Sequence, residues 1–150
     1  MMKDIIEKDI LLLKIKENDR DANRFLVERY PWLCPCRTED GIISDDYDYT
    51  WTELYNVPYG WIGMILDLCE NIREVLLMYN IPLKYYLLLE VKEKYGGLRW
   101  YDTLMGFDPM PNEIGDLVTE AENGSYNFCI LCGEPKQTNG YYCAECAKKV

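Results

Sequence analysis

Four cysteines near the end of the printed sequence carry its clearest chemistry. They are Cys129, Cys132, Cys143 and Cys146, spaced as C-x2-C-x10-C-x2-C. Each CxxC pair can offer two thiolates to one tetrahedral ion, and the ten residues between the pairs can bring them together. We therefore predict one bound zinc ion, with Gly133 allowing the tight first turn and Asn139-Gly140 reversing the chain.

The role expected of this zinc is structural. A catalytic zinc ion keeps one coordination position open for water, whereas four thiolates complete the tetrahedron. The sequence has no histidine, so it lacks the H-x-E element of the zinc deaminases, and Glu145 lies between two of the ligands. A catalytic zinc and four buried thiols without metal stay open as alternatives. A structural ion is favoured because the module has few apolar residues, while zinc binds zinc-finger peptides with roughly 10–16 kcal/mol.

Cys34 and Cys36 form a second pair of thiols, separated by Pro35. They could serve as a redox pair or as half of another metal site. One intervening residue strains a disulfide, however, and two ligands alone do not make a zinc site. We interpret them as semi-buried cysteines that follow a helix end. Cys69 lies on the apolar stripe of a predicted helix and is expected to pack.

Motifs of common enzyme classes are missing from the sequence. It contains no glycine-rich phosphate loop, no G-x-S-x-G elbow and no HExxH. Without histidine, a Ser-His-Asp or Cys-His mechanism is impossible. We predict no catalytic residues and a non-enzymatic function. An enzyme of unknown type that uses paired carboxylates stays open, since no two of the 26 acidic residues stand out from the rest.

The charge of the chain is negative and unevenly distributed. Sixteen basic residues oppose 26 acidic ones, giving a net charge of −10. Two stretches, 38–59 and 100–135, contain no lysine or arginine. A one-signed field speeds encounter with an oppositely charged partner, and it opposes nonspecific binding to a nucleic acid backbone. We expect these acidic stretches to face a basic surface on a host protein, and we do not expect nucleic acid to be a direct ligand.

Aromatic residues alternate with acids in the first of these stretches. The residues predicted to bind the partner are Asp45, Asp46, Asp48, Tyr49 and Trp51. Tyrosine and tryptophan are favoured at the centres of protein interfaces, where they could supply the short-range contacts. The alternative is that these aromatics belong to the core and the acids only keep the protein soluble.

A predicted hairpin supplies a different candidate surface. Its basic residues are Lys84, Lys92, Lys94 and Arg99, and its aromatic residues include Tyr86, Trp100 and Tyr101. Basic and aromatic side chains together can bind single-stranded nucleic acid or phosphate. Glu90 and Glu93 lie among them, so an ion-paired, solvated strand face is the commoner explanation. A nucleic-acid-binding zinc protein that uses this hairpin stays open as an alternative function.

Hydrophobic periodicity predicts the elements that must position these residues. Apolar spacings of three and four predict helices over 3–17, 22–28, 61–79 and 112–122. The stripe of the third helix comprises Ile62, Ile65, Leu66, Cys69, Ile72, Leu76 and Tyr79. Alternation predicts an extended segment over 45–55. A β-hairpin is predicted over 84–101, with Leu87, Leu89 and Val91 on one face and its turn at Gly96-Gly97.

These elements predict an α+β fold in which helices pack on a small antiparallel sheet. We expect a core domain over 1–123 and a zinc-knuckle module over 124–150, since 150 residues suit one domain with a small appendix. No apolar run is long enough to span a membrane, and none is followed by a signal-peptide cleavage site. We therefore expect a cytoplasmic protein with reduced thiols. The oligomeric state is not predicted.

Several segments in this order resemble a group of short, uncharacterised proteins of phages and prophages of Gram-positive bacteria. They are "LVERYPWL" (26–33), "DYDYTWTEL" (46–54), "YGWIGMILDLCENI" (59–72), "VKEKYGGLRWYD" (91–102) and the terminal double CxxC. The resemblance implies a small accessory protein of the host cytoplasm with a zinc-ribbon-like end, although Cys34 and Cys36 depart from the pattern. Phage accessory genes are rich in inhibitors of host defence. An anti-CRISPR-like inhibitor of a defence nuclease is therefore the sharpest expectation.

Overall fold

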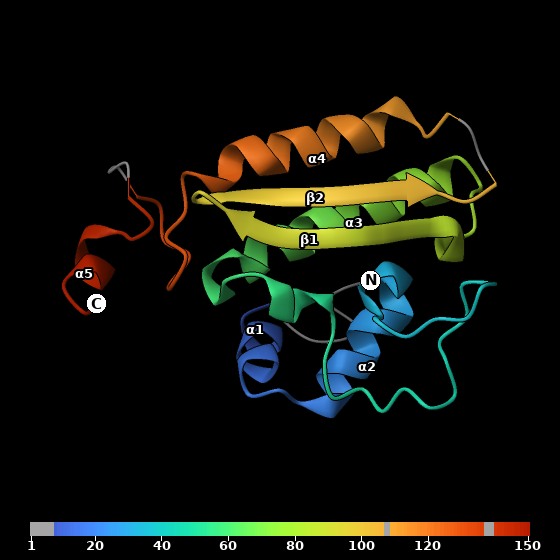
Figure 1. The fold of residues 1–150 in the computed structure, drawn as a ribbon, viewed down its shortest axis with the longest axis horizontal. Coiled ribbons are helices and arrows are strands. Elements are labelled where there is room, and N and C mark those ends of the chain that lie inside the picture. The colour runs from blue at the N-terminus through green and yellow to red at the C-terminus, as the bar shows by residue number, and fades with distance from the viewer. Residues whose placement is uncertain (1–7, 107–108, 137–139) are drawn as a thin grey trace.

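The computed structural model describes residues 8–106, 109–136 and 140–150, and it confirms the α+β fold. Its helices are α1 (Lys8–Lys16), α2 (Arg20–Arg29), α3 (Ile62–Met78), α4 (Asn112–Ser125) and α5 (Ala144–Ala147), and its strands are β1 (Tyr86–Lys94) and β2 (Gly97–Leu104). Short 3-10 helices cover Pro31–Leu33, Glu53–Asn56, Tyr59–Trp61 and Leu83–Tyr85. The two-stranded sheet packs against α3 and α4, and α5 lies at the far end of the molecule (Figure 1).

Helix α3 is the centre of the core, as its periodicity predicts. Six residues of the predicted stripe are buried, namely Ile62, Ile65, Leu66, Cys69, Ile72 and Leu76. The seventh, Tyr79, is 46% exposed because it lies beyond the last turn of the helix. Trp32 lies edge-on to Tyr86 with ring centroids 5.0 Å apart, and its Nε1 donates to the Cys69 sulfur over 3.4 Å. Cys69 is therefore a packing residue, and burial raises its pKa to about 12.

The hairpin forms, but two of its predicted details are wrong. Its turn is Tyr95-Gly96, both with positive φ, while Gly97 already pairs with Lys94 in the sheet. Two consecutive positive φ angles are the requirement of a tight two-residue hairpin turn. A β-bulge between Leu88 and Glu90 shifts the register. Leu89 is consequently 63% exposed and does not share the buried face of Val91.

Helix α4 closes the outer edge of β2. The backbone N–H of Leu98 donates to Ser125 Oγ over 2.8 Å, and that of Trp100 donates to Glu122 Oε2 over 2.9 Å. These two side chains satisfy strand donors that would otherwise point out of the sheet. At the start of β1, the Arg37 guanidinium donates hydrogen bonds to the backbone carbonyls of Lys84 and Tyr86.

The segment 45–55 is not a strand, which corrects the prediction from alternation. It is a loop that ends in the 3-10 helix Glu53–Asn56, and Tyr49 adopts a left-handed φ of 63°. Tyr47 is buried and its hydroxyl donates to the Trp51 carbonyl, so the chain folds back on itself. Local side-chain hydrogen bonds of aspartate and threonine compete here with extended structure.

Both N-terminal helices form: α1 covers Lys8–Lys16 of the predicted 3–17, and α2, at Arg20–Arg29, is longer than the predicted 22–28. In α1, Leu11 and Ile15 are buried while Ile10 and Leu13 are exposed. Positions 3–7, which begin the predicted first helix, lie outside the described residues. Asp19 caps α2 by accepting from the Ala22 N–H over 2.9 Å. Within the described ranges, none of the helices has the length and apolar character needed to cross a bilayer.

Candidate metal centre

The first CxxC pair lies on a tight turn that follows α4. The Gly133 N–H donates to the Cys129 carbonyl and the Cys129 N–H donates to the Glu134 carbonyl, both over 2.9 Å. The Glu134 N–H also lies 3.5 Å from the Cys132 sulfur. Gly133 has a φ of 80°, which confirms the glycine expected at this turn. The backbone thus places both sulfurs on the same side of the turn.

The second pair is positioned by α5, a single turn of helix. Cys143 is the N-cap of this turn, and its sulfur accepts from the Cys146 N–H over 3.4 Å. The Ile130 N–H donates to the Tyr141 carbonyl over 3.1 Å, which ties the second pair to the first. Asn139, part of the predicted chain reversal, lies outside the described residues.

The four sulfurs gather at one point. The sulfurs of Cys129, Cys132, Cys143 and Cys146 all lie within 4.8 Å of one another. Cys132 and Cys143, from different pairs, are 3.6 Å apart between sulfurs. A tetrahedral zinc ion with bonds of about 2.3 Å separates its sulfur ligands by about 3.8 Å. The geometry fits a metal ion with four thiolate ligands, and the sulfurs are too far apart for disulfides.

The electrostatics of the cluster also favour a cation. Burial alone would raise the pKa of Cys129, but backbone N–H groups pointing at its sulfur lower that pKa to about 6. Burial and the neighbouring thiols raise the pKa of Cys146 to about 12. Four crowded thiols cannot all ionise without a positive charge between them. A divalent ion supplies that charge and holds every ligand as thiolate.

Two glycines bring the cysteine turn onto the core. The Gly60 N–H donates to the Ile130 carbonyl over 2.9 Å. A Cβ on Gly60 would lie 2.2 Å from the Cys129 carbonyl oxygen, and one on Gly133 would lie 2.6 Å from the Gly60 oxygen. Both distances are far shorter than any normal contact, so only glycine permits this close approach. In the sequence, the glycine of "PYGW" at position 60 is the residue that marks this close contact, and the sequence analysis did not assign it a role.

Tyrosines of the module make a second contact, with the turn of the hairpin. Tyr126 packs on Gly97, where a Cβ would lie 2.2 Å from the phenol ring, and its hydroxyl accepts from Arg99. Tyr141 lies against Gly96. Helix α4 runs to Ser125 and therefore crosses the boundary drawn at residue 123. The module is continuous with α4 and docked at two places on the core.

The predicted partner-binding residues lie on the loop that replaces the expected strand. Asp45, Asp46 and Asp48 are exposed, and Trp51 is 41% exposed. Tyr49 is half-buried, with the Arg24 guanidinium 4.4 Å from its ring centroid. Hydrogen bonds from the Thr50 hydroxyl and N–H lower the pKa of Asp48. The structure therefore presents three carboxylates and one indole to solvent, while the Tyr49 ring packs against Tyr47 and Arg24.

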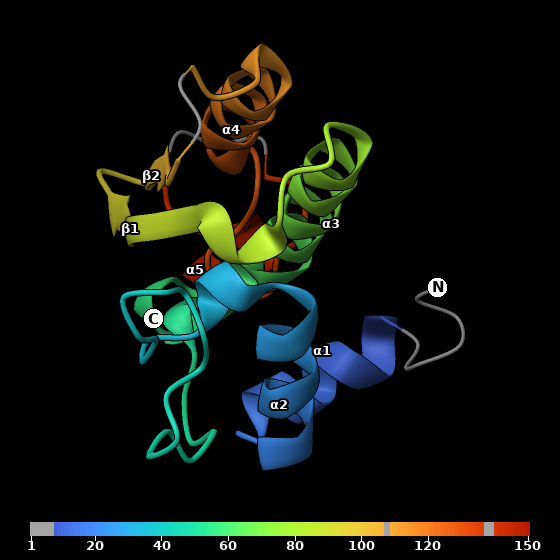
Figure 2. The ribbon, with the colours of Figure 1, turned by 90° about the vertical axis from the view of Figure 1, so that its right-hand side faces the viewer.

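The two acidic stretches do not form one surface. The loop of the first stretch and helix α4 of the second lie at opposite ends of the molecule in both views (Figures 1 and 2). Asp116 and Glu120 are exposed on α4, while Asp108 lies outside the described residues. A single flat partner surface would contact one stretch or the other.

The hairpin places some of its basic residues side by side. Lys92 and Arg99 are cross-strand partners, and the Lys92 ammonium lies 5.9 Å from the ring centroid of Tyr101. Glu90 pairs with Lys92 over 3.2 Å, as expected for an ion-paired strand face. Tyr86 and Trp100 are buried in the core and take no part in this surface.

Cys34 and Cys36 do not meet as a thiol pair. The Cys34 thiol donates to the Cys36 carbonyl over 3.3 Å, and both cysteines are free. Burial raises the pKa of Cys34, which makes its thiol less reactive. The bond to the carbonyl gives this cysteine a local structural role in the turn after Pro31–Leu33.

The fold and the site together define an α+β protein with a docked four-cysteine knuckle that could hold a metal ion. The chain matches no protein-family model, no curated protein and no solved structure.

Proposed function

We propose that this protein is a non-enzymatic, zinc-stabilised accessory protein of a phage type, which binds a host protein through its acidic loop. The acidic loop is residues 45–51, with Asp45, Asp46, Asp48 and Trp51 at its surface. The observation that carries the proposal is the exposure of all three aspartates on a loop whose Tyr47 is buried. A partner with a basic surface, in the host cytoplasm, fits this loop.

Zinc is the ion proposed for the cysteine cluster, and its role is structural. Four thiolates suit zinc among the divalent ions, and they leave no open position for water or substrate. The site would fix the two CxxC turns against Gly60 and the hairpin, which are the contacts described above. No step of chemistry is assigned to it.

The energetics require the aspartates to act together with Trp51. Exposed ion pairs contribute roughly 0–1 kcal/mol each, so three of them raise the association rate more than the affinity. A stable complex needs an interface of about 1,000 Å² or more with an aromatic anchor near its centre. Trp51 is the exposed indole of the acidic loop and is the proposed anchor.

The sharpest version of the proposal is inhibition of a host defence nuclease. Such an enzyme has a basic surface that normally receives nucleic acid, and an acidic loop can compete for it. The resemblance to phage and prophage proteins supports this version. Its direct consequence is that added DNA or RNA competes with the protein for the partner.

The first experiment is a pull-down from a Gram-positive host followed by mass spectrometry. Association rates of the recovered partner are then measured at low salt for the triple variant Asp45→Asn, Asp46→Asn, Asp48→Asn. We expect association to slow by about tenfold or more, and a Trp51→Ala variant to dissociate faster. The matched control neutralises three exposed acids elsewhere, namely Glu17→Gln, Glu28→Gln and Asp116→Asn. Equal rates for the triple variant and this control would reject the acidic loop.

A second candidate function, nucleic acid binding, is favoured by one observation. Lys92, which pairs with Glu90, and Arg99 stand directly opposite each other in the sheet and form a small basic surface. An anion bound between them would contact both cations, with the exposed Tyr101 available for base stacking. Direct binding of single-stranded DNA by the free protein, weakened by Lys92→Ala and by salt, would establish this function and displace the first.

A further inference from the structure

Two neighbouring hollows lie along the outer side of α3. The larger, with a volume of about 500 Å³, lies between α1, α3 and the first cysteine turn. The second, of about 300 Å³, lies between α3 and α4. Met64, Asp67 and Phe128 line both, so the hollows are two parts of one groove, called here the α3 groove. Figure 2 shows α3 between α4 and α1, with the sheet on its other side.

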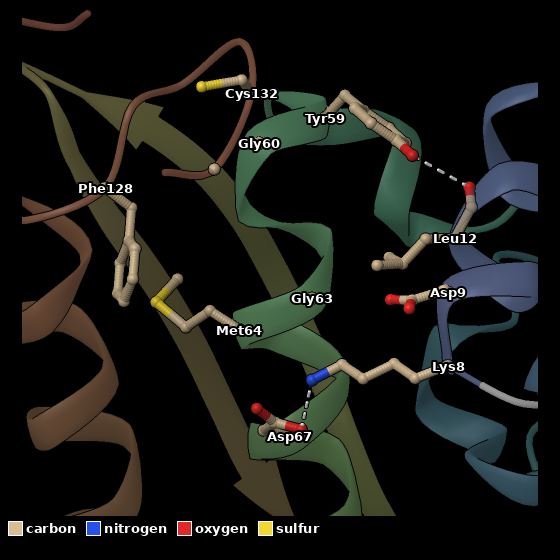
Figure 3. A pocket seen from close by; sticks show the side chains of 11 residues that line it. Lys8, Asp9, Leu12, Tyr59, Gly60, Gly63, Met64, Asp67, Phe128 and Cys132 are labelled. Carbon is tan, nitrogen blue, oxygen red and sulfur yellow. Dashed lines mark hydrogen bonds and ion pairs between the residues drawn. The ribbon is translucent and has the colours of Figure 1, made fainter. Parts of the chain in front are cut away.

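The floor of the α3 groove is apolar and incompletely covered. Leu12, Met64, Leu117 and Phe128 line it and are each only half-buried. Figure 3 shows Met64 and Phe128 pointing toward each other from α3 and the segment after α4, with Leu12 pointing in from α1. A Cβ on Gly63 would meet the side chains of Lys8 and Leu12 at 3.7 and 3.8 Å, which is ordinary van der Waals contact. Methionine adapts its shape to different apolar partners, which suits a binding floor.

The rim of the α3 groove is acidic. Asp9, Asp67 and Glu120 stand along it and are exposed. Lys8 is the basic residue that lines the groove, and its ammonium pairs with Asp67 over 2.7 Å (Figure 3). Helix α4, which forms one wall, contains no lysine or arginine. An occupant of the groove therefore meets an apolar floor between carboxylates.

We propose that the α3 groove binds a cationic amphipathic helix of a partner protein. Apolar residues at i, i+3 or i+4, and i+7 of that helix lie on Met64, Leu117 and Phe128, while its lysines and arginines meet the acidic rim. The length of α3 from Gly63 to Asn71 is about 12 Å at 1.5 Å per residue, which matches about two turns of a bound helix. This site lies on other elements than the acidic loop and goes beyond the function proposed above.

The cysteine cluster forms one end of the α3 groove. Cys132 and Gly133 line the larger hollow, and Gly133 is held against Gly60 by the close contact already described. A metal ion that fixes the first cysteine turn therefore also fixes the end of the groove. This link gives the candidate structural metal a consequence for binding.

The test uses a fluorescein-labelled helical peptide of leucine and lysine, about 14 residues long, with leucines at the spacing named above. Fluorescence anisotropy at low salt should show micromolar binding to the full chain. We expect Asp9→Lys or Glu120→Lys to weaken it by about threefold to tenfold, and Met64→Gln to weaken it by about tenfold. Asp116→Lys makes the same charge change on α4 outside the groove and should change affinity by less than twofold.

Two further measurements make the result decisive. Amide chemical shifts on peptide addition should change mainly at Gly63, Asp67 and Ala121, and the Asp45→Asn, Asp46→Asn, Asp48→Asn variant should bind the peptide unchanged. The proposal is overturned if a leucine–glutamate peptide or a scrambled peptide binds equally, or if Asp116→Lys matches Glu120→Lys. It is also overturned if sedimentation shows a dimer that Met64→Gln dissociates, or if anionic vesicles bind and the peptide does not.

Discussion

The core around α3 and the C-terminal cysteine module bury their side chains to very different extents. Seven side chains of α3 are buried, together with the large aromatics Trp32, Trp61 and Tyr86. In the described part of the chain after α4, only Cys129 and Cys146 are buried, while Leu131, Tyr141 and Val150 are exposed. Apolar burial at about 25 cal/mol per Å² can hold the first region. The cysteine module buries too little apolar surface for this, so it needs a cross-link. A metal ion bound by the four sulfurs would provide one.

The largest expected effect is loss of the metal from the module. We expect one zinc per chain, and Cys129→Ser should abolish it, because three thiolates bind far more weakly than a site whose binding contributes roughly 10–16 kcal/mol. Elemental analysis of protein purified without chelator measures the stoichiometry. Cys36→Ser, outside the module, is the control and should retain full metal. A stoichiometry near zero, or metal retained by Cys129→Ser, refutes the assignment.

Removing the metal should also show that the core and the cysteine module differ in stability. Chelation is expected to loosen residues 126–150 first and leave the helices mostly formed, because the core before α4 ends contains no ligand. Hydrogen exchange resolved by peptide, with circular dichroism in parallel, follows both regions. Complete loss of helical signal on chelation would show that the docking contacts at Gly60 and Gly97 make one cooperative unit.

The second-largest effect is expected in the core. Ile72 is fully buried on α3, and Ile72→Ala should lower the free energy of unfolding by about 2–5 kcal/mol through lost burial and a residual cavity. Leu77 lies on the same helix and is 49% exposed, so Leu77→Ala should cost less than about 0.5 kcal/mol. Urea unfolding monitored by circular dichroism measures both. Similar losses for the two variants would mean that α3 is not the centre of the core.

Periodicity predicted the parts of the fold that depend on burial along a single helix. The stripe of α3 and the positions of α2 and α4 follow from apolar spacing, and the cysteine cluster follows from paired ligand spacing. Alternation over 45–55 failed because Tyr47 is buried by a folded-back loop, in which Tyr49 takes a left-handed φ. Local side-chain hydrogen bonds favour this loop over a strand. The alternation of residue types in the sequence gives no information about such bonds.

Contacts between elements distant in sequence could not be predicted from local patterns. Gly60 and Gly133 are separated by about half of the chain, and neither residue type indicates a partner for the other. The caps that Ser125 and Glu122 place on the edge of β2, and the α3 groove, depend in the same way on how helices pack. The bulge at Leu89 could not be predicted either, because it depends on how the two strands pair, whereas the sequence of one strand shows only its alternation of residue types.

The third effect tests the joint between the two regions. Gly60→Ala places a Cβ 2.2 Å from a backbone oxygen of the module, which cannot move cheaply. Forced overpacking of this kind costs about 1–3 kcal/mol, and here it should undock the cysteine turn. Gly115→Ala on α4 is the control, since its Cβ meets nothing within 4 Å and helix propensity should gain about 0.5–1 kcal/mol. Unchanged exchange protection of residues 129–133 in Gly60→Ala would disprove the joint.

The smallest effect concerns an ion pair at the edge of the core. Arg29 donates two hydrogen bonds to Glu70, over 2.9 and 2.8 Å, and the Tyr30 hydroxyl donates a third over 2.7 Å. Burial alone would raise the pKa of Glu70, but these three bonds outweigh it and lower the pKa below its usual value of 4.5. The bonded carboxylate therefore stabilises the fold above pH 4.5, and this contribution is lost as the pH falls through the lowered pKa.

Glu70→Gln should remove that contribution. We expect a loss of about 1 kcal/mol at neutral pH, modest because both side chains keep some exposure, and a difference from the parent protein that shrinks below pH 4. Urea unfolding at pH 7, 5 and 3.5 measures the free energy. Asp67→Asn, which removes the exposed pair with Lys8, is the control and should cost less than about 0.5 kcal/mol. A Glu70→Gln difference that stays constant from pH 7 to 3.5 would show that the carboxylate stabilises the core by packing and not through its charge.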